Sequence, residues 1–128
     1  MKSETAAFLR KAREFLLKAR NLLDVMHYSD DAGRAAYLAG LHAAQALIFE
    51  RTSNVIKRHR RAQSELRRLT KDESSFDLEL RAFLGRTYNL KATADYDTDP
   101  GSGVTVEQAE QAIDTAGRFI ACVEELLT

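Results

Sequence analysis

The chain has 128 residues, with 19 Lys and Arg against 19 Asp and Glu, so no overall field draws it toward nucleic acid. A single cysteine excludes an internal disulfide and favours a reducing setting, and charges near the N-terminus argue against a signal peptide. No segment approaches the roughly 20 apolar residues of a membrane span. We therefore predict one soluble, cytoplasmic, all-α domain over residues 1–128.

The first predicted element is a long amphipathic helix near the N-terminus. Ser3 is expected to cap it, and apolar side chains then recur every three or four residues up to Met26. This helix should end near residues 27–28. The Ser-Asp-Asp sequence at 29–31 offers capping groups for the helix that follows.

Residues 34–51 are predicted to form the central helix of the molecule. The stretch is dense in Ala and Leu, the strongest helix formers, and small side chains occupy several of its faces. Small residues let neighbouring helices approach on more than one side. His42 and Gln45 are its polar candidates for the interior, and His42 is expected to be a hydrogen-bonded structural residue. The sequence at 52–54 should end the helix.

A short third helix and a longer fourth helix are expected next. The short one spans about residues 59–71, after a loop, and residues 72–75 form a turn. Ser74 or Ser75 is predicted to cap the fourth helix, whose apolar stripe continues to about Ala94.

The last predicted helix follows the strongest loop signal of the chain, at residues 97–103. Thr105 and Gln108 have the spacing of a capping box, and a narrow apolar seam follows them. Short connections between long helices favour antiparallel neighbours. The predicted fold is therefore an antiparallel bundle of four long helices plus one short helix.

A run of positive charge marks a candidate nucleic-acid surface. Seven cations lie between Arg51 and Arg68, against one acid, Glu65. Lysine and arginine bind phosphates by displacing counterions, although the run is equally compatible with a solvated helix face. No aromatic residue interleaves with these charges, so the sequence does not predict base stacking there. The cations assigned to phosphate binding are Arg51, Lys57, Arg58, Arg60 and Arg61.

Two further places carry groups that can do chemistry. His59 lies inside the basic run, where neighbouring cations lower a histidine pKa and suit a general base, or else a capping or solvent-facing role. Lys91 and Tyr96 lie five residues apart beside Asp95, and they can share one side of a helix end or be separately solvated. Because no His, Cys or carboxylate pattern has metal-ligand spacing, we predict no metal and no cofactor.

Three separate motifs resemble the HEPN superfamily, and the likeness covers roughly residues 34–125. They are the sequence Tyr-Leu-Ala-Gly-Leu-His-Ala-Ala-Gln-Ala-Leu-Ile at 37–48, His59 in its basic segment, and Leu-Lys-x-x-Ala-Asp-Tyr at 90–96. More narrowly, they look like a bacterial branch of small stand-alone proteins that carry an "FHAA-x-AL" helix and an "[RK]-x-x-ADY" segment.

The resemblance implies a compact bundle of four or five helices, often a homodimer. HEPN proteins are commonly paired with a minimal nucleotidyltransferase as a toxin–antitoxin system, so such an antitoxin and RNA or nucleotide are the implied partners. Active members are metal-independent ribonucleases built on Arg-x(4–6)-His, with the two residues facing a cleft shared between protomers. Some partners add AMP to a tyrosine near that motif.

In this chain Lys91 and Tyr96 stand where active members have arginine and histidine. A lysine can hold a phosphate as a point charge, whereas tyrosine, with a reference pKa of about 10, is a poor base at neutral pH. Tyr96 is also the implied acceptor of AMP. The resemblance therefore leaves three hypotheses open: an RNA- or nucleotide-binding protein of a toxin–antitoxin pair, a ribonuclease that uses Lys91, Tyr96 and His59, and a non-catalytic helical dimerisation module.

Overall fold

The computed structural model describes residues 1–99 and 102–128, and over these residues the chain is all-α, with no strand. The prediction of an all-α fold is confirmed. The helices contain 22, 24, 12, 19 and 21 residues in chain order. They are α1 (Ser3–Asp24), α2 (Ser29–Thr52), α3 (His59–Thr70), α4 (Leu78–Tyr96) and α5 (Val106–Leu126).

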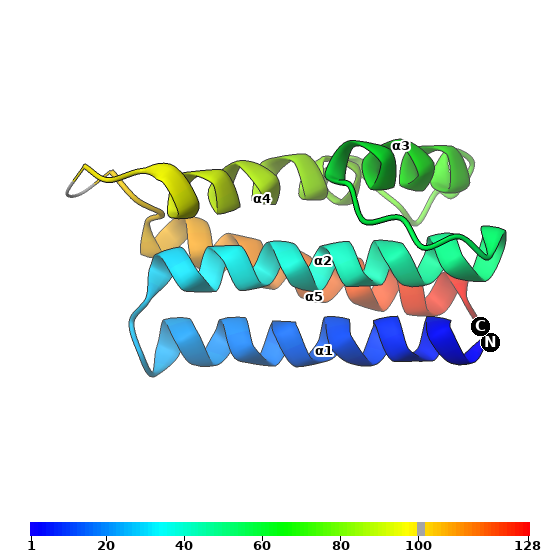
Figure 1. Ribbon diagram of the computed structural model, residues 1–128, viewed down its shortest axis with the longest axis horizontal. Helices are drawn as coiled ribbons and strands as arrows, with labels where there is room; N and C mark the ends of the chain where they lie inside the picture. Colours follow the sequence, from blue (N-terminus) through cyan, green and yellow to red (C-terminus); the bar gives the residue numbers. More distant parts are fainter. Residues whose placement is uncertain (100–101) are drawn as a thin grey trace.

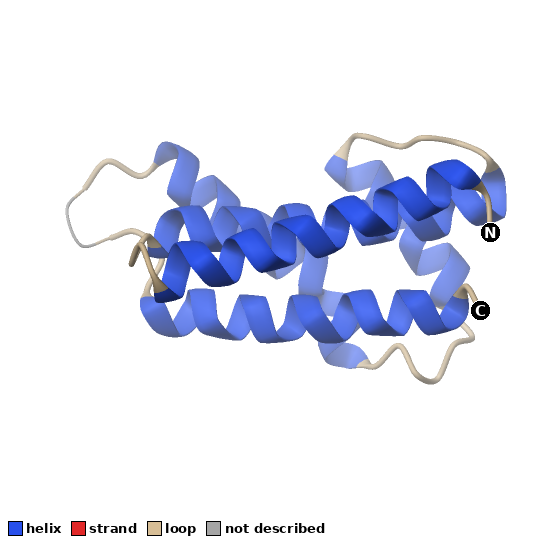
Figure 2. Ribbon diagram, turned by 90° about the horizontal axis from the view of Figure 1, so that it is seen from below, coloured by secondary structure: helices blue, strands red, loops and turns tan. Residues whose placement is uncertain are grey.

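Helix α2 lies at the centre of the molecule and contacts all four other helices. Figure 1 shows α1 and α4 running opposite to α2 on its two sides, with α5 behind it and parallel to it. The view in Figure 2 shows long helices running lengthwise through the molecule, and the chain termini lie at one end. The prediction that this stretch forms the central helix is confirmed.

The composition of α2 explains its position. Alanines on several faces are fully buried, so the neighbouring backbones come close on more than one side. Gln45 is buried and its amide donates to the carbonyl of Ile56 at 3.0 Å, while its Oε1 contacts Nδ1 of His42 at 2.8 Å. His42 also lies against the Phe15 ring, 5.3 Å between centroids. The structural role expected for His42 is therefore observed.

Two predicted N-caps are wrong because the serines have other partners. Ser3 is the first residue of α1, whose cap position is Lys2, and it donates to Glu4 instead. Residues 29–31 form the first turn of α2 and do not cap it. The Ser29 hydroxyl donates to the Val104 carbonyl at 2.6 Å, and these residues thus hold the segment before α5 against the start of α2.

The prediction that Ser74 or Ser75 caps α4 is wrong. The cap is Asp77, whose carboxylate accepts from the amide of Leu80 at 3.0 Å. The cause is Phe76, which is only 1% exposed and packs edge-on against Phe119. The chain turns through residues 71–76 to bury this ring, and only then can the helix begin. The helix also runs two residues past its predicted end, to Tyr96.

The predicted start of α5 is confirmed, and the structure shows where its apolar seam packs. The Thr105–Gln108 capping box is present. Residues 100–101 of the predicted loop lie outside the described residues. The seam residues Ala109, Ile113, Ala116, Ile120 and Val123 are buried in the core of the chain itself. A dimer must therefore use another surface. No helix of the described residues is long and apolar enough to cross a membrane.

Candidate functional site

Three aromatic rings from three helices meet at the start of α3. The His59 ring stacks on Tyr88 of α4, with centroids 4.0 Å apart and planes 11° from parallel. Tyr37 of α2 approaches Tyr88 edge-on, and its hydroxyl lies 3.0 Å from Nδ1 of His59. No other hydrogen bond reaches the His59 ring from the described residues, so Nε2 is left without a protein partner.

Long-range contacts place His59 there. The segment before α3 is anchored by Ile56, whose side chain is 3% exposed and whose carbonyl accepts from Gln45 of α2. Helix α3 therefore begins on the surface of α2, beside the third turn of α4. This position brings an imidazole from a basic segment onto two tyrosines that are distant in sequence.

The environment of this cluster sets its protonation. Burial, together with the neighbouring Tyr88, raises the pKa of Tyr37 to about 12, so its phenol stays protonated. Burial and then the charge of Arg60 lower the pKa of His59 below its usual range, which keeps the imidazole neutral at pH 7. If Nδ1 carries the proton and donates to the phenol oxygen, Nε2 has the free electron pair that a general base needs.

The pKa of His59 can be tested directly by NMR titration of the imidazole. We expect a value below about 6.5, and Tyr88→Leu should raise it because a ring face is returned to water. In the unfolded chain the His59 imidazole is protonated as the pH falls below about 6.5, whereas in the folded protein its pKa is lower. The free energy of unfolding therefore falls as the pH drops from about 6.5 to the pKa of the folded state. Tyr28→Leu, an exposed tyrosine between α1 and α2, is the control. An unchanged titration in Tyr88→Leu would contradict the desolvation argument.

A charged cluster adjoins the aromatic one along the same helix faces. Lys91 and Asp95 follow Tyr88 at helical spacing on α4, and Arg34 precedes Tyr37 by three residues on α2. The Asp95 carboxylate contacts Lys91 Nζ at 2.6 Å and Arg34 Nε at 2.7 Å. Lys91 and then Arg34 lower the pKa of Asp95, so this carboxylate stays charged and holds both cations in place.

The structure separates Lys91 from Tyr96. Five residues correspond to about 140° around a helix, so the two side chains leave α4 on different sides. Lys91 is held by Asp95, whereas Tyr96 is the last residue of α4 and is 81% exposed. Three residues that the sequence did not assign to the site contact it in the structure. Tyr37 and Tyr88 contact His59, and Arg34 contacts Asp95. Their only sequence signal was the shared spacing of three and four along each helix.

Four of the five predicted phosphate-binding cations flank His59 in sequence. Their side chains are exposed and have no hydrogen-bond or ion-pair partner among residues 1–99 and 102–128: Lys57, Arg58, Arg60 and Arg61. Arg51 differs, because it lies at the end of α2 and donates to the carbonyl of Leu126. No aromatic residue interleaves with the basic run in sequence, but in the structure Tyr88 of α4, 40% exposed, stacks on His59 within that run.

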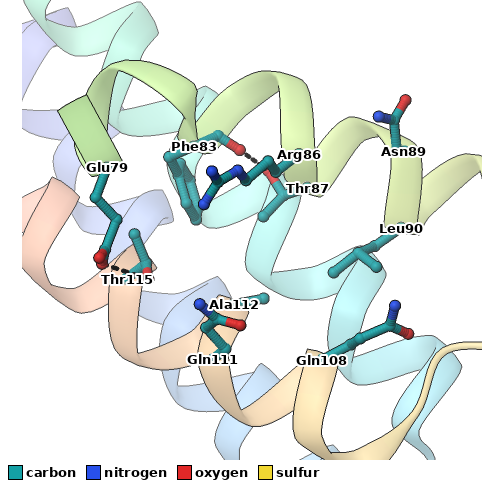
Figure 3. A pocket seen from close by; sticks show the side chains of 10 residues that line it. All are labelled: Glu79, Phe83, Arg86, Thr87, Asn89, Leu90, Gln108, Gln111, Ala112 and Thr115. Atoms are coloured by element: carbon teal, nitrogen blue, oxygen red, sulfur yellow. Dashed lines mark hydrogen bonds between the residues drawn. The ribbon is translucent and has the colours of Figure 1, made fainter.

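A pocket of about 320 Å³ lies elsewhere, between α4 and α5. Figure 3 shows Arg86 and Leu90 on its α4 side and Gln111 on its α5 side. None of the site residues predicted from sequence lines it. Within the described residues no group of three or more His, Cys, Asp or Glu side chains is placed to hold a metal ion.

The described residues form five helices, and a histidine and two tyrosines are in contact where α2, α3 and α4 meet. The model of the HEPN domain matches residues 5–126. The chain therefore belongs to the HEPN family, whose domains are nucleotide- or RNA-related, or ribonuclease-like, modules that often dimerise. Comparison with curated proteins finds no match to it.

Proposed function

We propose that the protein binds RNA or nucleotide phosphates through the surface around His59, as a HEPN protein of the toxin–antitoxin type with a minimal nucleotidyltransferase partner. The proposal covers one HEPN-like domain over residues 1–128, a bundle of four long helices plus one short helix, acting in the cytoplasm as a homodimer. The "[RK]-x-x-ADY" segment at 91–96 supports its place in the small stand-alone branch.

One observation carries this proposal: four exposed cations, which have no partner among the described residues, flank in sequence a histidine that is stacked on a half-exposed tyrosine. Exposed cations bind phosphates and release counterions, whereas cations already paired with carboxylates gain less. An exposed aromatic edge beside them can contact a base of single-stranded RNA. The described residues combine these features at the start of α3, which favours RNA over a purely structural role.

Metal-independent RNA cleavage is a second candidate, and the neutral His59 is the observation that favours it. A base at Nε2 can take the proton of a ribose 2′-hydroxyl, and the 2′-oxygen then attacks the adjacent phosphorus. The bond from phosphorus to the 5′-oxygen breaks, which leaves a 2′,3′-cyclic phosphate, and the leaving 5′-oxygen takes a proton from the imidazolium or from water. A lysine such as Lys91 can stabilise the charge that develops on the phosphate oxygens. Because the Lys91 ammonium is paired with the Asp95 carboxylate, it must either bind the phosphate while it stays paired or leave Asp95.

Incubation of the purified protein with total cellular RNA in EDTA tests both candidates. We expect RNA binding in a gel-shift assay, and cleavage, if it occurs, should be lost in His59→Ala and in Lys91→Ala. Lys71→Ala, an exposed lysine at the end of α3, is the matched control. RNA that is intact in every lane but still shifted leaves a binding protein. No shift and no cleavage would overturn the proposed function.

Tyr96 is the proposed acceptor if a nucleotidyltransferase partner adds AMP. Its side chain is 81% exposed at the end of α4, so a partner can reach the hydroxyl without unfolding the helix. Mass spectrometry of the protein co-expressed with such a partner should show AMP on the peptide that contains Tyr96, and not on the Tyr96→Phe variant. An unmodified wild-type peptide would refute this assignment.

A further inference from the structure

The cavity between α4 and α5 has the features of a small-molecule site. Its volume of about 320 Å³ is at the lower end of ligand pockets, which are usually apolar with a few polar groups that converge on the ligand. The apolar part comes from Phe83, Leu90 and Ala112, and Phe83 is itself fixed by its contact with Phe119. The pocket is therefore lined by residues of two helices, and its Phe83 wall is part of the core.

The polar groups of the pocket are chiefly free hydrogen-bond donors. Arg86 and Gln111 have no hydrogen-bond or ion-pair partner within the described residues, and both line the cavity (Figure 3). Gln108 uses its Oε1 to accept from the amide of Thr105 at 3.0 Å, which leaves its NH₂ group available. A guanidinium and two amide NH₂ groups that line one cavity match the acceptor oxygens of a carboxylate or phosphate.

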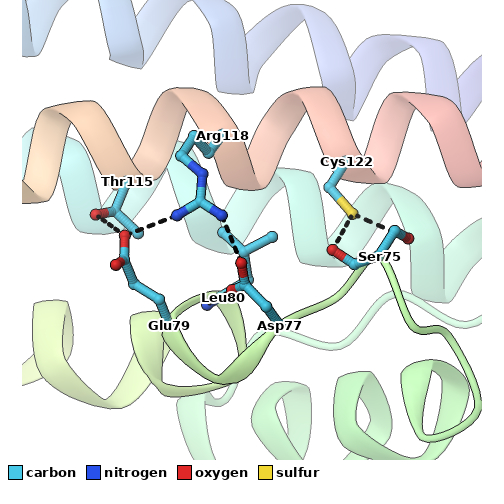
Figure 4. A network of polar contacts seen from close by, with 7 residues as sticks. All are labelled: Ser75, Asp77, Glu79, Leu80, Thr115, Arg118 and Cys122. Atoms are coloured by element: carbon cyan, nitrogen blue, oxygen red, sulfur yellow. Dashed lines mark hydrogen bonds and ion pairs between the residues drawn. The ribbon is translucent and has the colours of Figure 1, made fainter.

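Among the described residues, the one carboxylate that lines the pocket already has hydrogen-bond and ion-pair partners. Glu79 accepts from Arg118 Nη1 at 2.8 Å and from the Thr115 hydroxyl at 3.1 Å. Figure 4 shows this network at the start of α4, where Arg118 also binds Asp77. Glu79 shares the Arg118 guanidinium with Asp77 and makes no ion pair with Arg86. The guanidinium of Arg86 has no ion-pair partner among the described residues.

We infer that this pocket binds a small organic anion with a carboxylate or phosphate group on an apolar body. The charged group lies on Arg86, with Gln108 and Gln111 as further donors, and the apolar body lies against Phe83 and Leu90. The site is separate from the proposed RNA surface, because Tyr88 lies about 200° around α4 from both Arg86 and Leu90. One helix thus carries two sites on different faces.

Isothermal titration calorimetry with benzoate, phenyl phosphate and neutral benzamide tests this inference. We expect at least one of the two anions to bind saturably and benzamide to bind much more weakly. Arg86→Gln should reduce the affinity for the anion by about tenfold or more, because the charge-assisted hydrogen bonds are lost. The matched control is Arg67→Gln, an exposed arginine of α3 that is unpaired among the described residues and should leave binding unchanged.

A second variant tests whether the ligand binds inside the cavity. Ala112→Leu fills the pocket and should also abolish anion binding, and Arg86→Gln keeps the test valid if that variant fails to fold. Binding of benzoate alone would identify a carboxylate ligand, and binding of phenyl phosphate alone a phosphate monoester. Absence of saturable binding by both anions, or equal affinity in Arg86→Gln, would overturn the inference. Neither result bears on RNA binding at His59.

Discussion

Simultaneous replacement of Lys57, Arg58, Arg60 and Arg61 by glutamine is expected to lower RNA affinity by about a thousandfold at roughly 50 mM salt. The physical reason is the loss of four counterion-releasing contacts. Each contact with a single strand contributes about 0.7 to the slope of log affinity against log salt, so four contribute about three. Because these side chains are exposed and have no partner among the described residues, the variant should fold normally.

The measurement is fluorescence anisotropy of a labelled single-stranded RNA over a series of salt concentrations. A matched variant removes the same charge from other exposed positions by changing Arg10, Lys11, Lys18 and Lys71 to glutamine. Its affinity should fall only slightly, with nearly the same salt slope as the wild type. Equal losses in the two variants would show that net charge governs binding, and the surface around His59 would then have no special role.

Much of the fold follows from sequence because local composition determines the elements. The Ala- and Leu-rich stretch at 34–51 could be placed at the centre because small residues on several faces allow neighbouring helices to pack closely on more than one side. The Thr105–Gln108 capping box was also readable, since both partners of the motif are three residues apart. The predicted cap at Ser74 or Ser75 failed because burial of Phe76 delays the start of the helix, whereas Ser3 donates to its neighbour Glu4.

The candidate site was only partly predictable because its contacts join distant residues. Helical spacing shows that Tyr88, Lys91 and Asp95 share a face of α4, but not which face of another helix it meets. The ion pair of Arg34 with Asp95 spans 61 positions, and the contact of Tyr37 with His59 spans 22. Sequence therefore identified His59 and Lys91 as candidates, whereas their partners required the packing of α2 against α3 and α4.

The contact between α2 and α4 depends on Gly40. A Cβ atom at this position would lie 3.0 and 3.1 Å from two ring atoms of Phe83 and closer still to a third. That ring is 2% exposed and packs against Phe119 at 5.0 Å between centroids, so it has little room to move. Gly40 thus allows the close helix approach that also sets the spacing of Tyr37 and Tyr88.

Gly40→Ala is therefore expected to lower the free energy of unfolding by about 2 kcal/mol, since overpacking of a core outweighs the better helix propensity of alanine. Urea denaturation measures the change, and Gly117→Ala on α5 is the matched control. A Cβ at Gly117 would meet only Leu16, at 3.9 Å, so this variant should gain up to about 1 kcal/mol. If both substitutions stabilised the protein equally, the α2–α4 contact would be looser than the structure shows, and the aromatic cluster at His59 would lose its main support.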